Sequence, residues 1–327
     1  MDFGKLITES FNITWNKKIL WIFGALAGGV SGFGGIFNLI SYIPSSLPFE
    51  SPKDKALSTL NVMGANTTSQ DNQVLYKTAS DVLSSPTLQV IVLVILAALV
   101  VILLVGFLAA FINNLANSAL VYSIINLPER EPKFNEGLKA GLHFWFRYFK
   151  LNLIVISSYL TLIILLIGVP LIFFLLSLKI IGIIFAIISF LLFLLSTFIL
   201  GIPVSIILLI AQRIIIAKNS QVIDSLKEAV LLFKNNLGNS ILAWLIIWAL
   251  SFVYGFLTLF LTFIVGAPLV GIIIASFSTS VAAGITVIIV SAVTFMAIFI
   301  LIGSIWSVFQ SSFWTIFYTY LERKEVI

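Results

Sequence analysis

The sequence contains no cysteine, a single histidine and few charged residues. The absence of cysteine excludes disulfide bonds, thiolate metal sites and a cysteine nucleophile, and one histidine excludes a metal site built from several of them. Charged residues make up 9% of the 327 residues, whereas a soluble domain carries about 25%. This shortage rules out an ordinary soluble globule, a disordered protein and a nucleic-acid-binding domain.

The charged residues are unevenly distributed, and long parts of the chain contain almost none. Between residues 150 and 213 only Lys150, Lys179 and Arg213 are charged, and no charged side chain occurs from Asn235 to Leu321. Hydrophobic residues make up 60% of the chain, and its mean hydropathy is +1.16. Long apolar runs of this kind are typical of membrane-spanning helices. We therefore expect an all-α, polytopic helical membrane protein.

Six stretches are long and apolar enough to cross a bilayer, which needs about 20 residues of helix. They form three pairs, and each pair follows an amphipathic segment that ends in a basic or amide cluster such as Lys17-Lys18. We expect these segments to lie as helices at the membrane surface. The chain then forms one membrane domain, 1–327, of three pseudo-repeats at 3–125, 134–217 and 222–321. The expected spans cover residues 19–42, 88–112, 151–178, 180–211, 237–266 and 282–320.

The distribution of charge predicts the orientation in the membrane. With six spans, both termini lie on one side, and that side holds 14 of the 18 lysines and arginines. By the positive-inside rule this side is cytoplasmic, so we expect a multi-pass protein of the cell membrane with both termini in the cytoplasm. The one long polar loop, 44–85, then lies outside the cytoplasm. Its Asn66-Thr67-Thr68 triplet fits a glycosylation acceptor, although such triplets also arise by chance.

Short motifs near the ends of the expected spans follow a loose pattern. They are WNKKILWIFG at 15–24, FNEGLKAG at 134–141, SLKEA at 225–229, FKNN at 233–236 and FYTYLER at 317–323. In these motifs the chain resembles the membrane domain attached to some glycerophosphoryl diester phosphodiesterases, and the uncharacterised prokaryotic membrane proteins that share this domain. The resemblance implies a membrane fold. It implies no activity, because the catalytic domain of the phosphodiesterases is absent from the sequence.

Basic and amide side chains near the cytoplasmic surface are the main candidates for a binding site. The amides either form a polar cap that lines a lipid-headgroup pocket or simply join neighbouring helices by hydrogen bonds. Cations at the ends of the amphipathic segments and spans are expected to bind anionic headgroups. The expected headgroup residues are Lys17, Lys18, Arg147, Lys150, Arg213 and Lys234, and the expected polar cap comprises Asn113, Asn117, Gln212 and Gln310.

Glycine and proline mark two further groups of residues. Gly24, Gly28 and Gly32 recur every four residues, a spacing that lets helix backbones approach closely, so we expect a helix-packing face; a flexible glycine turn is the alternative. Three Gly-x-Pro triplets predict kinks in the spans, since proline lacks the backbone N–H. Kinked helices also build substrate sites in transporters, but the neighbours of these kinks are apolar. The expected kinks are at Pro170, Pro203 and Pro268.

The absence of reactive side chains from the spans favours a function without catalysis. Proton-coupled transporters place ionisable groups within their spans, and hydrolysis needs an activated nucleophile or a metal-bound water. We therefore expect a non-enzymatic, membrane-organising or accessory protein without cofactor or metal. Its expected partners are membrane lipids and either further copies of itself or another membrane protein, with no nucleic acid. A transporter of lipid or small apolar solutes, and a membrane anchor for an enzyme on another chain, stay open as alternatives.

Overall fold

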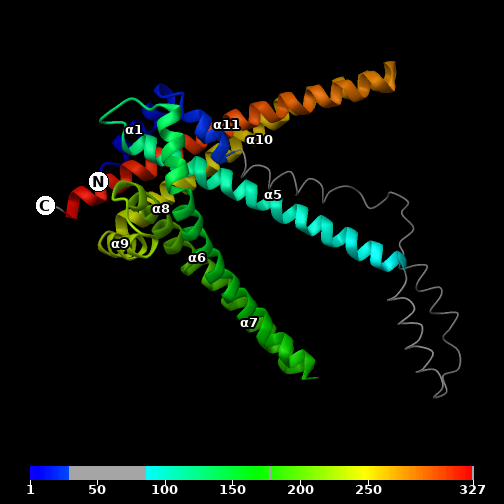
Figure 1. The fold of residues 1–327 in the computed structure, drawn as a ribbon, viewed down its shortest axis with the longest axis horizontal. Helices are drawn as coiled ribbons and strands as arrows, with labels where there is room; N and C mark the ends of the chain where they lie inside the picture. The colour runs from blue at the N-terminus through cyan, green and yellow to red at the C-terminus, as the bar shows by residue number, and fades with distance from the viewer. Residues whose placement is uncertain (29–85, 177, 326–327) are drawn as a thin grey trace. The chain divides into compact units, whose positions relative to one another are not determined.

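The computed structural model describes residues 1–28, 86–176 and 178–325, which form helices joined by turns with no strand among them (Figure 1). The prediction of an all-α fold is therefore confirmed. Residues 20–28 are helical. The other helices are α1 (Phe3–Asn16), α5 (Pro86–Ile125), α6 (Phe134–Leu175), α7 (Lys179–Ile199), α8 (Gly201–Ala217), α9 (Val222–Asn235), α10 (Leu237–Thr279) and α11 (Val281–Glu325).

Five stretches of helix within the described residues are long and apolar enough to cross a membrane. The chain is thus a multi-pass membrane protein, as the hydropathy predicts. Most of the first expected span, 19–42, lies outside the described residues, so the total of six stays a prediction. The loop 44–85, with Asn66, and Gly32 also lie outside them. The five stretches are Leu96–Ile125, Phe134–Leu175, Ile180–Ala217, Leu237–Thr279 and Val281–Arg323.

The chain divides into two compact units. The first unit holds α1, the helix at 20–28 and all helices from Ala110 onward. The described part of the second unit is the beginning of α5, up to Ala109, where large apolar side chains such as Leu93 and Ile102 are about 70% exposed. The candidate site described below lies entirely in the first unit.

The long helices of the first unit are packed at one end and exposed along the rest. In α6 the buried positions recur up to Leu151, and beyond it most large apolar side chains are exposed as far as Leu175. In α10 the same change follows Ile247, and α11 is buried mainly from Ser304 onward. Exposed Leu, Ile and Phe in such numbers are the surface that lipid tails cover in a bilayer. The exposed arms are therefore the lipid-facing part of these helices.

The exposed arms form two helical hairpins. α10 and α11 run side by side on either side of Ser280 (Figure 1). α6 and α7 pair in the same way, and the rings of Phe173 and Phe185 stack 4.7 Å apart between them. Every backbone N–H in hydrocarbon needs a partner within the protein, and a helical hairpin supplies one at each residue except near its turn.

The packed ends meet in a core around the last turns of α11. Phe313, Trp314 and Phe317 are each exposed by 2% or less. They belong to one cluster with Tyr148 of α6 and Ile210 of α8, and α8 in turn contacts α6, α10 and α11. Aromatic rings of this size bury a large apolar area. The core is therefore built from helix ends that are far apart in the sequence.

Glycine allows the helix at 20–28 to lie close against α11. A Cβ atom added at Gly24 would lie 2.6 Å from the carbonyl oxygen of Ser304, and one added at Gly28 would lie 3.0 Å from the carbonyl oxygen of Gly303. The hydroxyl of Ser304 also donates to the carbonyl of Trp21. Both glycines of the expected packing face that the structure describes thus lie at a close helix contact.

A second close contact joins the start of α6 to the end of α5. A Cβ atom added at Gly141 would lie 2.8 Å from the carbonyl oxygen of Leu115, and the hydroxyl of Ser118 donates to the carbonyl of Gly141 over 3.2 Å. One turn earlier, Gly137 lies against the ring of Phe23 in the helix at 20–28. Three helices therefore approach one another through small residues.

The structure differs from expectation at the second amphipathic segment. Residues 134–150 form no separate surface helix but continue into the span as α6. Lys150 and Leu151 both keep helical conformation, so the segment and the span form one helix. The first and third segments do end, because Lys17 (φ −110°, ψ 66°) and Asn236 (φ −130°, ψ 36°) leave helical conformation.

The three prolines occupy two kinds of position. Pro203 lies in the first turn of α8, just after the break between α7 and α8 at Leu200, so the expected span 180–211 is formed by two helices. Proline is tolerated in a first turn, where the N–H has no helical partner. Pro170 and Pro268 lie inside α6 and α10, which continue on both sides of them.

We predict that Gly24→Ala lowers the stability of the purified protein in detergent. The added methyl group meets the backbone of α11, and overpacking of this kind costs about 1–3 kcal/mol. Thermal unfolding followed by tryptophan fluorescence measures the loss. Gly255→Ala is the matched control, because a Cβ atom there meets no neighbour within 4 Å. Equal melting temperatures for the two variants would contradict the close packing.

Candidate functional site

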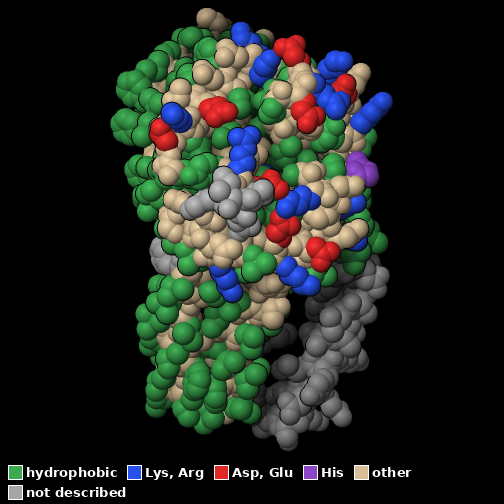
Figure 2. All heavy atoms as spheres, turned by 90° about the vertical axis from the view of Figure 1, so that its left-hand side faces the viewer, with side chains coloured by type: hydrophobic (Ala, Val, Ile, Leu, Met, Phe, Trp, Pro, Cys, Tyr) green, Lys and Arg blue, Asp and Glu red, His purple; other side chains and the backbone are tan. Residues whose placement is uncertain are grey.

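Charged side chains gather at the packed end of the first unit. Figure 2 shows lysines, arginines and carboxylates spread over the upper part of the view, while the described segments that extend below it carry mostly hydrophobic side chains. The charged part includes the ends of α8, α9 and α11, which lie next to one another in the core. A surface divided in this way fits a membrane protein at the level where the hydrocarbon gives way to water.

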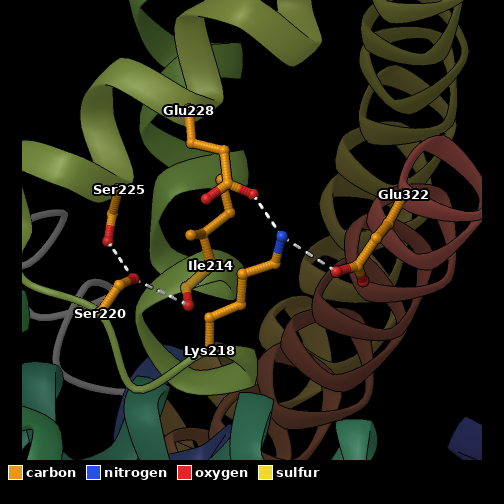
Figure 3. Close-up of polar contacts among 6 residues, drawn as sticks. All are labelled: Ile214, Lys218, Ser220, Ser225, Glu228 and Glu322. Atoms are coloured by element: carbon orange, nitrogen blue, oxygen red, sulfur yellow. Dashed lines mark hydrogen bonds and ion pairs between the residues drawn. The ribbon is translucent and has the colours of Figure 1, made fainter. Parts of the chain in front are cut away.

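An ion-pair cluster joins three helices at this end. The Lys218 ammonium, which follows the last turn of α8, lies 2.7 Å from Glu228 Oε1 of α9 and 3.2 Å from Glu322 Oε1 of α11 (Figure 3). These contacts raise the pKa of Lys218, the hydrogen bond with Glu228 having the largest effect. Lys218 is therefore fully charged near neutral pH and ties α9 to the end of α11.

The loop between α8 and α9 is held by side chains on both sides. The Ser220 and Ser225 hydroxyls lie 2.7 Å apart, and Ser220 also donates to the carbonyl of Ile214 over 3.3 Å (Figure 3). Arg147 of α6 donates to Asn219, with 2.9 Å to its carbonyl and 2.7 Å to its side-chain oxygen. Asn219 has a φ of 51°, a conformation that asparagine tolerates better than most residues. Arg147 therefore acts here as a clamp on the loop.

The six expected headgroup cations fall into different environments. Arg147 is bound to the α8–α9 loop, as described above. Lys17 forms an ion pair with Glu131 at 2.9 Å, and this contact lowers the pKa of Glu131. Arg213 is 3% exposed and lies inside the core. Lys18, Lys150 and Lys234 are exposed on the surface.

Lys150 lies next to exposed apolar side chains. Its ammonium is 4.5 Å from the centre of the Phe146 ring, a cation–π contact on the outer side of α6. Phe146 is 48% exposed, and Leu153, one turn beyond Lys150 along α6, is 52% exposed. A cation held beside an aromatic ring and an aliphatic surface is typical of the boundary between headgroups and lipid tails.

The expected polar cap is divided between two places in the structure. The Asn117 side-chain amide donates to the side-chain oxygen of Asn113 over 2.6 Å, and Asn113 in turn donates to the carbonyl of Ala27 over 3.2 Å. Next to them, Asn152 of α6 donates to the side-chain oxygen of Asn114 over 2.7 Å. These amides therefore join helices by hydrogen bonds.

Arg213 and Gln212 form the second part, on α8. Arg213 donates to the carbonyl of Leu209 over 2.9 Å and to the side-chain oxygen of Gln212 over 3.2 Å, while its Nε has no hydrogen-bond partner among the described residues. The Tyr148 hydroxyl donates to the carbonyl of Gln212 over 2.9 Å. Gln310 is half-buried on α11, and no described hydrogen bond joins it to either group. The contacts thus link the amides to their own neighbours rather than to one common pocket.

The described residues at the packed end line grooves, two of which are large enough for a ligand. The larger, about 610 Å³, lies between α1, the end of α5 and the end of α11, and its polar lining includes Glu9, Lys17 and Arg323. The smaller, about 490 Å³, lies between α6 and the beginning of α9, and it is lined by Lys150 and Asp224 together with aliphatic side chains. Both volumes lie in the range of small-molecule sites, about 300–1,000 Å³.

The ion-pair cluster and the Gly137–Gly141 contact are absent from the sequence-based predictions. A sequence signal exists for each. Lys218 and Glu322 both lie within a few residues of the end of an expected span, so opposite charges at the ends of two spans could have suggested a pair. Gly137 and Gly141 have the same four-residue spacing as Gly24 and Gly28, but they lie in a charged segment and not in an apolar one.

The helical hairpins, the lipid-facing arms and the charged end define the class of a multi-pass helical membrane protein. Within the described residues no group of three His, Asp or Glu side chains could hold a metal ion. Comparison with protein families, with curated proteins and with solved structures finds no match to the chain. The resemblance to the membrane domain of glycerophosphoryl diester phosphodiesterases stays a prediction.

We predict that Lys218→Gln lowers the melting temperature in detergent by roughly 2 °C. The variant removes both ion pairs of the cluster, and partly exposed pairs contribute up to about 1 kcal/mol each. Because the pKa of Lys218 is raised in the folded chain, its contribution is fully present below the ordinary lysine pKa of about 10.4 and is lost as the pH rises through the raised value. The difference from wild type should persist from neutral pH to about pH 10 and shrink above it.

Lys227→Gln is the control for this measurement. Lys227 is exposed on α9 and forms no ion pair with a described residue, so its loss changes the net charge equally and leaves the cluster intact. If both variants melt alike, or if the difference for Lys218→Gln is unchanged above pH 11, the cluster does not stabilise the fold as described.

Proposed function

We propose that the protein is a non-enzymatic, membrane-organising or accessory protein that engages anionic lipid headgroups on the side of the membrane where both termini lie. One observation carries this proposal. Each of the three exposed cations expected to bind headgroups lies three or four residues after an exposed large apolar side chain. Such a pair suits the membrane surface, where the apolar group enters the bilayer and the cation meets phosphate.

The three pairs come from three different parts of the first unit. Trp15, 54% exposed, precedes Lys18; Phe146, 48% exposed, precedes Lys150; and Leu231, 58% exposed, precedes Lys234. A lysine near an anionic leaflet contributes about 1 kcal/mol to lipid binding. Acting together, three such sites would concentrate anionic lipids around the protein.

Helices α1 and α9 support this proposal by the division of their surfaces. α1 buries Leu6, Ser10 and Thr14 in the protein and exposes Phe11 and Trp15 on another face. α9 likewise buries Ala229 and Leu232 and exposes Ile223 and Leu231. The protein core thus covers one face of each helix, and the exposed apolar side chains are available to the membrane surface.

The same proposal includes the location of the chain in the cell membrane with both termini in the cytoplasm. Its support is the sequence distribution of lysine and arginine, because the side that holds the termini carries 14 of the 18. Anionic lipids of the cytoplasmic leaflet would then face the exposed cations.

We predict that the triple variant Lys18→Gln, Lys150→Gln and Lys234→Gln retains less anionic lipid than wild type. At about 1 kcal/mol for each cation, the affinity at each site should fall about fivefold. Native mass spectrometry of the protein purified in mild detergent with phosphatidylglycerol measures the bound lipid.

A second triple variant, Lys5→Gln, Arg130→Gln and Lys133→Gln, is the matched control. It removes the same charge from exposed side chains that have no exposed large apolar neighbour one turn away, and two of them pair only with Glu136, at 3.6 Å and 3.8 Å. Equal loss of lipid in both triple variants would show a general effect of charge. Unchanged retention in the first variant would refute the proposal.

We predict that a thiol introduced at residue 5 is protected in intact cells and that one at residue 179 reacts with a membrane-impermeant maleimide. The sequence contains no cysteine, so Lys5→Cys and Lys179→Cys each carry one thiol. Permeabilised cells provide the control, because both thiols should then react. The reverse pattern would invert the orientation, and equal reaction in intact cells would contradict the odd number of spans expected between the two positions.

A further inference from the structure

Two lysines bracket the exposed arm of α6. Lys150 lies at the point where α6 leaves the core, and Lys179 is the first residue of α7, just beyond the turn that ends α6. Between Leu151 and Leu175 the helix carries no charged residue, and at 1.5 Å per residue these 25 positions rise about 38 Å. A bilayer is about 30 Å thick in its hydrocarbon and 40–45 Å including the headgroups. The arm of α6 that follows Lys150 is therefore long enough to reach from one headgroup layer to the other.

The smaller groove lies at the level of Lys150. Lys150, Leu153 and Ile154 of α6 form one side of it, and Ile223 and Asp224 of α9 form the other. Leu153 and Ile154 lie one turn closer to the hydrocarbon than Lys150 and are 52% and 40% exposed. The groove therefore has a charged opening at headgroup depth and an aliphatic wall that leads toward the lipid tails.

The groove carries one charge of each sign. Asp224 has no ion pair or hydrogen bond with a described residue, and the ammonium of Lys150 contacts the face of Phe146 and no carboxylate. A phosphate placed at Lys150 therefore lies in the same groove as a carboxylate. A second negative group on the ligand would be repelled by Asp224, whereas an amine would be attracted to it.

We propose that this groove binds one phospholipid with a zwitterionic aminophosphate headgroup. The phosphate is held by Lys150, the ammonium group is held by Asp224, and an acyl chain lies along Leu153, Ile154 and Ile223. The aliphatic wall favours the whole lipid over the free headgroup, because a soluble phosphodiester would leave that wall exposed to water. This inference rests on the proposed function only in placing this end of the protein at the membrane surface.

The test compares phosphatidylethanolamine with phosphatidylglycerol on the full chain in detergent, measured by titration in native mass spectrometry. We expect wild type to bind the first lipid at least fivefold more tightly at one site. Lys150→Gln should weaken both lipids about fivefold or more, since both carry the phosphate. Asp224→Asn should weaken phosphatidylethanolamine about fivefold and leave phosphatidylglycerol equal or tighter. Lys227→Gln, on the same helix but outside the groove, should change neither.

A bulky variant and a competition experiment test the groove independently of charge. Ile223→Trp adds bulk at a side chain that is 62% exposed and should block the site without a change of charge, so it tests the groove even if Asp224→Asn folds poorly. Soluble glycerophosphoethanolamine should compete at least 100-fold more weakly than the lipid; equal competition would make the free headgroup the ligand. Equal weakening of both lipids by Asp224→Asn, or no effect of Ile223→Trp, would overturn the site. If either result were found while wild type still retained phosphatidylglycerol through its three exposed lysines, the groove proposal would fail and the proposed function would not.

Discussion

The structure depends on one constraint: inside a bilayer, each backbone amide must find its hydrogen bond within the protein. A chain with 9% charged residues and no charged side chain from Asn235 to Leu321 has no means of keeping those stretches in water. Helices satisfy the constraint locally, so the apolar stretches form the uninterrupted helices α10 and α11, joined at a single residue. The charged residues are then left near the helix ends, and it is there that side chains can form ion pairs and polar contacts.

Small residues decide how those ends assemble. Lipid tails are as apolar as leucine, so hydrophobicity alone does not hold membrane helices together, and close backbone contact becomes more important. Gly24 against Ser304, and Gly141 against Leu115, bring backbones into contact without intervening side chains. Hydrogen bonds from Ser118 and Asn113 to carbonyls of neighbouring helices add direction to the same contacts. The core thus combines large aromatic side chains on α11 with glycine where two helices approach most closely.

Hydropathy alone predicts most of the fold and little of the site. The spans could be predicted from the sequence because a continuous run of apolar residues is enough to place a helix in lipid. Spacing also pointed to Asn113 and Asn117, four residues apart, which are hydrogen-bonded in the structure. Lys218 and Glu322 are 104 positions apart, and only the packing of α8 on α11 brings them within 3.2 Å. Arg213 shows a different limit of the sequence pattern. A cation near the end of a span need not face the headgroups, and Arg213 is only 3% exposed.

The contacts of each cation show whether its charge stabilises the protein or is available to a ligand. Arg147, Lys17 and Lys218 have partners within the protein, and their charge holds a loop, a turn or a helix end in place. Lys150 has an aromatic ring beside it and an aliphatic wall one turn away, and it lies about 38 Å of helix from the turn that precedes Lys179. Under the proposed function, a cation without a carboxylate partner at the depth of the phosphates is stabilised by the anionic groups of the membrane. Because Asp224 lines the same groove, the ligand proposed for it carries an amine as well as a phosphate.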